Sequence, residues 1–231
     1  MNVAVILAGG SGQRMKMEVP KQFLFVKDKP VIIYTMEAFQ KHPSIDAIYV
    51  SCIGGWEEIL SGYAEQFGIT KLESVVTGGK NGQESAYNAI KEIAKKYSKD
   101  DIVMLHDANR PLITQEIISD SLVQCQKYGV AVAGIPCTEP LFVKEEDGSS
   151  HKCLPRDLLI RTQTPHTLSV GKMLWAHEEA LSRGITNSIA TGTILIELGE
   201  EVFLSIGAEQ NFKLTTQEDL DLFKARLELK K

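Results

Sequence analysis

A glycine-rich stretch near the start of the chain carries residues that could do phosphate chemistry. It reads Leu7-Ala8-Gly9-Gly10-Ser11-Gly12, directly after an apolar run, and the cationic residues Arg14 and Lys21 follow it. Glycine lets the backbone turn through positive φ and brings main-chain N–H groups close to an anion. Two fixed cations beside such a loop would stabilise the negative charge that develops during nucleotidyl transfer. The stretch therefore predicts a phosphate-binding loop.

The glycine pattern by itself leaves a second interpretation open, namely a turn that only connects two elements. Its spacing differs from the dinucleotide-binding fingerprint, and it lacks the Gly-Lys-Ser/Thr ending of a P-loop. The choice between the two interpretations depends on whether other segments carry matching chemistry.

A second polar segment, His106-Asp107-Ala108-Asn109-Arg110-Pro111, follows the apolar run at residues 102–105. Ligands of open parallel sheets bind beyond the carboxyl ends of the strands. Asp107 is therefore placed to hold Mg²⁺ or a substrate hydroxyl, and Arg110 to meet a phosphate. The plainer alternative is that Asp107 caps a turn and Arg110 is a solvated surface charge. For His106 we expect packing at the strand end rather than catalysis as a base.

Two further segments carry weaker signals. Gly78-Gly79-Lys80, with Ser85 opening a helix, could present backbone groups and a hydroxyl to a nucleotide base. A plain strand-to-helix turn explains the same residues. In Asn211-Phe212-Lys213-Leu214-Thr215-Thr216, a threonine is a credible helix N-cap. Lys213 could reach a phosphate or remain a surface lysine.

The elements that would position these segments alternate between strand and helix. Apolar β-branched runs predict strands, and amphipathic stretches of helical length predict the helices between them. The expected strands are residues 3–7, 47–52, 72–76, 101–106 and 130–135, and the expected helices are 30–40, 56–67, 83–97 and 114–128. This alternation predicts an α/β fold with a doubly wound, mainly parallel sheet and helices on both faces.

The alternation breaks after Pro136. Residues 137–163 show short extended pieces around the turn Glu145-Glu146-Asp147-Gly148, without a helical period. They predict a β-hairpin arm that projects from the sheet. The remaining expectations are a strand at 201–206 and helices at 171–182, 189–198 and 217–228. We therefore expect a single domain, residues 1–231, that carries an arm.

Composition and charge argue against several classes of partner. The 231 residues are 43% hydrophobic and carry a formal net charge of −5, with acidic and basic residues mixed. This balance argues against binding to nucleic acid or to a membrane surface. No apolar stretch approaches the ~20 residues of a membrane span, and no signal-peptide pattern opens the chain. The four cysteines lack metal-ligand spacing. We expect a cytoplasmic protein with reduced thiols.

Taken together, the segments resemble the methylerythritol-phosphate cytidylyltransferase family and its close relatives, the ribitol-phosphate cytidylyltransferases. The segments that match span nearly the whole chain, and their joint order and spacing are specific. They are residues 7–15, Pro20-Lys21-Gln22-Phe23, Gly78-Gly79, Ser85, residues 106–111, Arg161-Thr162-Gln163-Thr164-Pro165 and residues 211–216.

The resemblance implies a nucleotidyltransferase that uses CTP and Mg²⁺, with an alditol phosphate as nucleophile and pyrophosphate as leaving group. No covalent enzyme intermediate is expected. The resemblance also implies a homodimer formed through the arm. The residues that it makes catalytic are Arg14, Lys21 and Lys213.

The resemblance assigns binding roles as well. The nucleotide would be held by residues 7–12, Gly79, Lys80 and Ser85. The acceptor would be held by Asp107, Arg110, Arg156 and Thr164, of which Arg156 and Thr164 would meet its phosphate across the dimer interface. The expected ligand for Mg²⁺ is Asp107.

The chain departs from the family pattern at three places. Gly82 stands where the family usually has an arginine, and Glu139-Pro140 replaces an Asp-Thr pair on the arm. Residues 186–190, Thr-Asn-Ser-Ile-Ala, replace an acidic stretch. The last two departures fall where the family shapes its acceptor pocket or the surroundings of that pocket. Methylerythritol, ribitol and other polyol phosphates therefore all stay open as acceptors.

Two other functions compete with this reading. A sugar-1-phosphate nucleotidyltransferase that uses UTP or another triphosphate would share the first loop. Such enzymes do not usually carry the segments at 106–111 and 211–216 together. A catalytically silent nucleotide-binding or scaffold protein would be favoured by loss of Arg14 or Lys21, and both residues are present.

Overall fold

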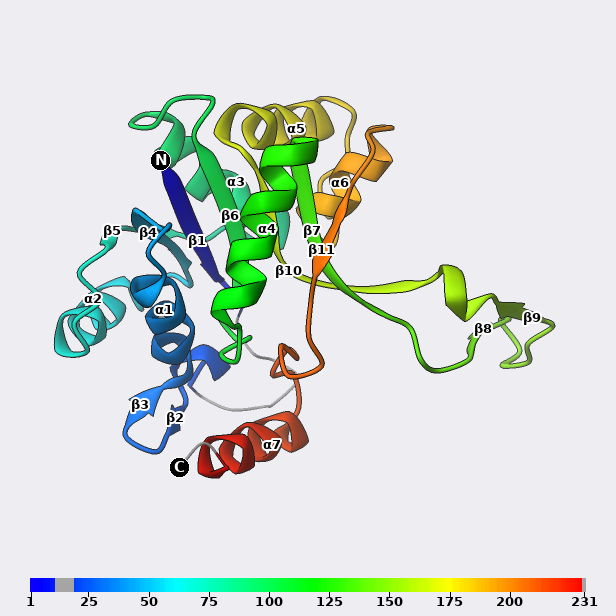
Figure 1. The fold of residues 1–231 in the computed structure, drawn as a ribbon, viewed down its shortest axis with the longest axis horizontal. Coiled ribbons are helices and arrows are strands. Elements are labelled where there is room, and N and C mark those ends of the chain that lie inside the picture. Colours follow the sequence, from blue (N-terminus) through cyan, green and yellow to red (C-terminus); the bar gives the residue numbers. More distant parts are fainter. Residues whose placement is uncertain (11–18, 230–231) are drawn as a thin grey trace.

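The structure is a computed structural model that describes residues 1–10 and 19–229. A seven-stranded sheet with the order β11-β7-β10-β6-β1-β4-β5 forms its centre (Figure 1). These strands are β11 (Leu204–Ile206), β7 (Val130–Pro136), β10 (Ile160–Ser169), β6 (Ile102–Asp107), β1 (Asn2–Ala8), β4 (Ala47–Cys52) and β5 (Leu72–Thr77). The pairs β1–β4, β1–β6, β4–β5 and β11–β7 are parallel, which confirms the predicted α/β class.

Helices cover both faces of this sheet because its central strands are apolar on both sides. In β1, Ala4 and Ile6 pack into one buried cluster, and Val3 and Val5 pack into another. The helices that contribute to the first cluster are α1 (Val31–Lys41), α2 (Glu57–Gln66) and α4 (Gln115–Tyr128). Those of the second cluster are α3 (Gly82–Ala94), α5 (Val170–Ser182) and α6 (Thr191–Glu197). The doubly wound arrangement follows from this two-sided burial.

A third, smaller cluster attaches the C-terminal helix α7 (Gln217–Glu228). Phe223 and Leu220 of α7 pack against Val26 and Val31, together with Leu112 and Leu214. Val26 belongs to a short antiparallel pair, β2 (Phe25–Val26) and β3 (Lys29–Pro30), which follows the 3-10 turn η2 (Lys21–Phe23). This packing brings the segment before α7 back toward the first loop.

The long strand β10 is the main departure from the predicted elements. It lies between β6 and β7 and is antiparallel to both. Residues 160–163 fall in the range 137–163 within which the sequence predicts an arm, but they belong to β10, and residues 160–162 pair with β7 in the central sheet. Ile160, for example, pairs with Pro136 of β7. Thr162 and His166 flank a shift in the register of β10 with β7, where side chains can be re-aimed.

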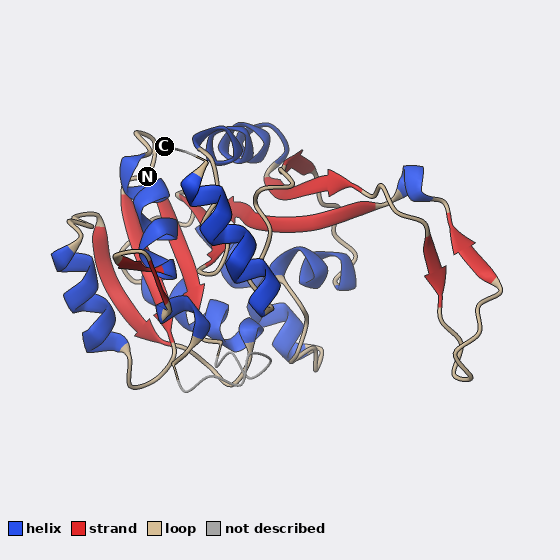
Figure 2. Ribbon diagram, turned by 90° about the horizontal axis from the view of Figure 1, so that it is seen from below, coloured by secondary structure: helices blue, strands red, loops and turns tan. Residues whose placement is uncertain are grey.

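Outside the sheet, β8 (Leu141–Val143) pairs antiparallel with β9 (Lys152–Leu154), and the 3-10 turn η3 (Arg156–Leu158) follows. Figures 1 and 2 show this segment extending away from the body of the molecule. Large apolar side chains on it are solvent-exposed, Phe142 at 67% and Leu158 at 80%. Among the described helices, none has the length and apolar character to cross a membrane.

Smaller differences occur near the C-terminus. Helix α6 begins at Thr191 rather than at residue 189, because Ala190 before it is extended, with φ −163° and ψ 160°. Strand β11 begins at Leu204, three residues later than predicted. Helix α7 has the predicted bounds, and Thr216 is its N-cap in a capping box with Asp219.

Candidate active site

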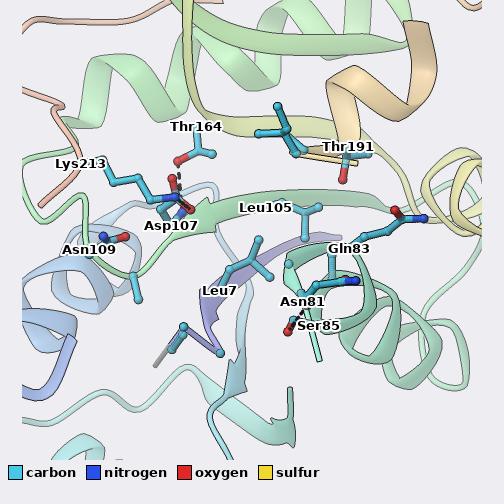
Figure 3. Close-up of a pocket in the computed structure, with 18 of the residues that line it drawn as sticks. Leu7, Asn81, Gln83, Ser85, Leu105, Asp107, Asn109, Thr164, Thr191 and Lys213 are labelled. Carbon is cyan, nitrogen blue, oxygen red and sulfur yellow. Dashed lines mark hydrogen bonds and ion pairs between the residues drawn. The ribbon is translucent and has the colours of Figure 1, made fainter. Parts of the chain in front are cut away.

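A pocket of about 550 Å³ opens at the carboxyl ends of β1 and β6 (Figure 3). Leu7 and Ala8 at the end of β1 line it, as do Leu105 and Asp107 of β6. Residues 162–164 of β10 form another part of its wall. The pocket thus lies where an open parallel sheet binds ligands.

The start of the first loop is held by a buried glutamine. Gln22 in η2 donates from Nε2 to the carbonyl oxygens of Ala8 at 2.7 Å and Gly10 at 3.0 Å. Lys21, the neighbour of Gln22, lines the pocket together with Gly9 and Gly10. The predicted site residues Ser11, Gly12 and Arg14 lie outside the described residues.

The second glycine segment packs directly against the first loop. A Cβ added at Gly9 would lie 2.8 Å from Oγ of Ser85, so only glycine fits this approach. The Ser85 hydroxyl accepts the N–H of Gly79 at 3.0 Å and donates to the carbonyl of Asn81 at 2.8 Å. Asn81 in turn caps α3 by accepting the N–H of Glu84 at 2.9 Å. Ser85 therefore fixes the shape of this loop.

Lys80, which precedes α3, and Gly82, its first residue, complete this wall of the pocket. A Cβ added at Gly82 would meet nothing within 4 Å, so a larger side chain has space there. Gly82 itself thus adds no charge to this wall, although the fold has room for a longer side chain at this position.

Asp107 is the centre of a charged cluster at the other end of the pocket. Its Oδ1 accepts from Nζ of Lys213 at 3.0 Å, and its Oδ2 accepts from Nε of Arg110 at 2.9 Å. Arg110 also donates from Nη1 to the carbonyl of Asn211 at 2.7 Å. Burial opposes ionisation of the Asp107 carboxyl, but the charges of Lys213 and Arg110 outweigh it and hold the pKa well below its usual range.

Lys213 reaches this cluster because its own segment is hydrogen-bonded to the turn that follows β6. Leu214 donates its N–H to the carbonyl of Asn109 at 2.8 Å, and Asn109 donates from Nδ2 to the carbonyl of Leu214 at 2.6 Å. The Leu214 side chain is buried in the cluster around α7. The sequence left Lys213 as either a surface or a phosphate-binding lysine, and the structure places it in the pocket.

Thr164 joins β10 to the same cluster. Its Oγ1 accepts the N–H of Asp107 at 3.1 Å and lies 3.0 Å from Nδ1 of His106. The other ring nitrogen of His106 lies 3.2 Å from the carbonyl of Arg110. Because a carbonyl only accepts, Nε2 carries the proton and Thr164 donates to Nδ1. His106 is fully buried, which agrees with the expectation of a packed histidine.

Among the described residues that were predicted for the site, Arg156 lies outside the pocket. It belongs to η3 and donates from Nη1 to the carbonyl of Thr138 at 3.2 Å, on the projecting segment. Twelve predicted residues do line the pocket: Leu7, Ala8, Gly9, Gly10, Lys21, Gly79, Lys80, Ser85, Asp107, Arg110, Thr164 and Lys213.

Several pocket residues were not predicted. Gln83 is buried and connects α3 to the loop between α5 and α6. It donates to the carbonyl of Ile185 at 2.6 Å and accepts the N–H of Ser188 at 2.8 Å. His166, His177 and Thr191 also line the pocket. Their sequence signals were weak, because a lone polar residue within an amphipathic helix or strand does not indicate which way it faces.

The pocket offers few oxygen ligands to a metal ion. Asp107 is the single acidic side chain among its described lining residues. The described residues contain no group of three histidine, cysteine or acidic side chains that could hold a metal. Mg²⁺ usually binds through one or two carboxylates plus substrate phosphates. Among the described lining residues, Asp107 is the one carboxylate that could hold such an ion if it arrived on a nucleotide.

Four histidines are buried, each with a lowered pKa, and the three with the largest shifts contribute most to the dependence of stability on pH. Burial lowers the pKa of His106, His166 and His177 to about 4. In the unfolded chain they take up protons near pH 6.5, so between pH 6.5 and 4 the unfolded state binds more protons. Stability therefore falls as pH is lowered through this window, by up to about 1.4 kcal/mol per pH unit for each histidine. The lowered pKa of Asp107 changes the stability only at pH values below about 3.8, the ordinary pKa of an aspartate side chain.

Urea unfolding at intervals from about pH 7 to about pH 4 measures this dependence. We expect the free energy of unfolding to decline along the series. His177→Leu should decline less steeply because it removes one of the three groups. A flat profile, or an identical slope in the variant, would contradict the neutral buried state of these histidines.

Comparison with known proteins gives a consistent result over nearly the whole chain. A 43% identical relative, covering 98% of both chains, is a ribitol-5-phosphate cytidylyltransferase of Lacticaseibacillus paracasei. A 33% identical relative, covering 98% of this chain and 97% of its own, is a 2-C-methyl-D-erythritol 4-phosphate cytidylyltransferase of Clostridium botulinum.

Solved structures support the fold. The Francisella tularensis 2-C-methyl-D-erythritol 4-phosphate cytidylyltransferase superposes with a TM-score of 0.81 at 23% identity, covering 98% of this chain and 100% of its own. Residues 2–229 match the model of the family described as IspD, 2-C-methyl-D-erythritol 4-phosphate cytidylyltransferase. With this match and the curated relatives, the chain belongs to the 2-C-methyl-D-erythritol 4-phosphate cytidylyltransferase family.

Proposed function

We propose that this protein transfers a cytidylyl group from CTP to an alditol phosphate, and that ribitol 5-phosphate is its preferred acceptor. The observation that carries the choice of acceptor is the 43% identity, over 98% of both chains, to a relative named ribitol-5-phosphate cytidylyltransferase. The cationic pocket at the ends of β1 and β6 supports the transfer itself.

In the proposed reaction an oxygen of the acceptor phosphate attacks the α-phosphorus of CTP. The bond from that phosphorus to the bridging oxygen breaks, and pyrophosphate leaves. The two glycine segments hold the nucleotide, and Lys21 faces the charge that develops on its phosphates. Lys213, held in place by Asp107 at 3.0 Å, meets the acceptor phosphate. The protein supplies positioning and charge rather than a nucleophile.

Mg²⁺ is part of this proposal as an ion that enters with CTP. Asp107 would hold it, since each carboxylate oxygen keeps a lone pair beyond the one given to Lys213 or Arg110. When bound, the ion neutralises charge on the phosphates. We also propose a cytoplasmic location, which the four free cysteines support.

Pyrophosphate release tests the reaction directly. CTP is paired with ribitol 5-phosphate, 2-C-methyl-D-erythritol 4-phosphate and other alditol phosphates. Each of the other nucleoside triphosphates is paired with ribitol 5-phosphate, and UTP is also paired with a sugar 1-phosphate. We expect release with CTP, and the highest kcat/KM with ribitol 5-phosphate. Preference for UTP with a sugar 1-phosphate would favour the sugar nucleotidyltransferase. No release with any pair would favour a silent nucleotide-binding protein.

We further propose that the protein acts as a homodimer through the segment that contains β8, β9 and η3. In a single chain this segment exposes Phe142 at 67% and Leu158 at 80%, a cost that burial against a second copy would remove. Arg156 lies on the same segment and outside the pocket of its own chain. A partner's Arg156 would complete each site.

Mixed dimers test this arrangement. Arg156→Ala and Lys21→Ala should each be nearly inactive alone. After the two are mixed and allowed to exchange subunits, one site of each mixed dimer has an intact Lys21 and an intact Arg156 from its partner. About a quarter of all sites should then regain activity in a two-fold symmetric dimer. Light scattering reports the dimer independently. A mixture as inactive as its components, or a fully active monomer, would contradict the proposal.

A further inference from the structure

His177 and Thr191 form a polar pair deep in the pocket wall that the proposed reaction does not yet use. His177 of α5 is 1% exposed and Thr191 of α6 is 4% exposed, yet both line the pocket. Nε2 of His177 lies 3.2 Å from Oγ1 of Thr191. The ring stacks on Tyr87 of α3 with an interplanar angle of 8°.

Nδ1 of His177 is buried and has no hydrogen-bond partner among the described residues. A buried N–H without a partner is rarer than an unpaired acceptor, so the proton belongs on Nε2 and points to Thr191. The Thr191 hydroxyl then accepts from His177, and its own O–H is free to donate elsewhere. Leaving Nδ1 of His177 buried and unpaired lowers the stability of the fold, so a role other than packing would explain a histidine at this position.

The free O–H belongs to an uncharged part of the pocket. Figure 3 shows the oxygen of Thr191 turned toward the pocket interior, on the side away from Asp107 and Lys213. Ile189 and Ala190, which precede Thr191, also line the pocket and carry no charge. Burial lowers the pKa of His177 to about 4, so its ring is neutral near pH 7. Ile189, Ala190, Thr191 and the neutral His177 offer no positive charge to a phosphate. A hydroxyl group of a ligand can instead accept a hydrogen bond from Thr191.

We propose that Thr191, oriented by His177, binds a hydroxyl group of a bound substrate and so contributes to substrate choice. This inference rests on the proposed function, whose two substrates both carry hydroxyls: the alditol chain of the acceptor and the ribose of CTP. Thr191 makes the contact, and His177 is a positioning residue that directs the Thr191 O–H into the pocket.

Thr191→Val removes the hydroxyl while keeping the shape of the side chain. We expect KM for the contacted substrate to rise about fivefold to tenfold, with little change in kcat. Thr191→Ser should restore KM. If the contact is to the alditol, the KM for ribitol 5-phosphate rises and an acceptor lacking that hydroxyl shows no penalty. If it is to the ribose, KM for CTP rises, and either 2′-deoxy-CTP or 3′-deoxy-CTP, whichever lacks the contacted hydroxyl, shows no penalty.

His177→Leu tests the positioning role. It should raise the same KM as Thr191→Val, without lowering the thermal midpoint, because an apolar side chain of similar size replaces a ring with an unpaired nitrogen. Thr167→Val is the matched control, since Thr167 is also buried and bonds a side chain, Ser121, at 2.7 Å, but lies outside the pocket. It should leave both KM values unchanged.

Wild-type KM values for both substrates in Thr191→Val would overturn the inference, as would a KM increase that persists with the deoxy substrates. A lower thermal midpoint with unchanged KM in His177→Leu would show that the His177–Thr191 pair only stabilises the fold and does not bind substrate. Failure of the proposed function is distinguishable, because wild type would then release no pyrophosphate with any pair. Calorimetric titration of CTP and of ribitol 5-phosphate into wild type and Thr191→Val still measures the contact in that case.

Discussion

We expect Lys21→Ala to lower kcat by about 10² to 10³ while changing the affinity for CTP far less. Lys21 lines the pocket at the start of η2, next to Gln22, whose side chain holds the carbonyls of Ala8 and Gly10. Its ammonium group is thereby carried on the element that also shapes the phosphate loop. Charge on the α-phosphate of the transferred cytidylyl group and on pyrophosphate grows in the transition state, so removing a fixed cation there raises the barrier most.

Steady-state kinetics with CTP, together with calorimetric binding of CTP, separates the two effects. Lys95→Ala is a suitable control because Lys95 is 71% exposed in an i,i+3 pair with Glu92 on the surface. It should match wild type in both assays. Arg14→Ala is expected from the sequence to behave like Lys21→Ala. Near-normal turnover in both variants would refute the assignment of the first loop to catalysis.

Asp107→Asn should reduce kcat/KM by about 10² and the free energy of unfolding by about 3 kcal/mol. The carboxylate balances two cations, Arg110 with 12% of its side chain exposed and Lys213 with 41%. An amide of the same shape leaves Arg110 as a largely buried charge without its partner. Lys213 also loses the contact that holds it toward the acceptor. The variant should therefore lose both activity and stability.

Urea denaturation and turnover, measured on the same preparations, test this expectation. A double-mutant cycle with Lys213→Ala isolates the pair, and we expect the two substitutions to be far from additive in kcat/KM. Asp120→Asn serves as the control, since Asp120 accepts the N–H of Ile206 at 2.7 Å at a site away from the pocket. Full activity in Asp107→Asn would remove Asp107 and its metal role from the proposed mechanism.

Local sequence determined most of the fold. Strands such as β4 and helices such as α7 have the predicted bounds, because their periodic apolar residues and caps act within a few residues. Strand β10 was missed because its polar residues, from Arg161 to Thr164, do not form an apolar run. Its partners β6 and β7 lie far away in the chain, and strand pairing of that kind is decided by tertiary contacts.

The sequence by itself also determined which chemistry the chain could do. The glycines and cations of the first loop and the segments at 106–111 and 211–216 indicate phosphate transfer. Their residue types and order suffice for that, since backbone N–H groups, carboxylates and ammonium groups have fixed chemistry. They did not determine that Lys213 lies against Asp107, because two residues more than a hundred positions apart have no local signal of their proximity.

Tertiary structure alone decided those contacts. The two hydrogen bonds between Asn109 and Leu214 bring Lys213 to Asp107, whose side chain is 15% exposed and also pairs with Arg110. The same folding placed His177 beside Thr191, which no spacing in the sequence indicates. Such pairs arise when helices pack on a sheet, and their energies depend on burial and on unpaired atoms that exist only in the folded chain.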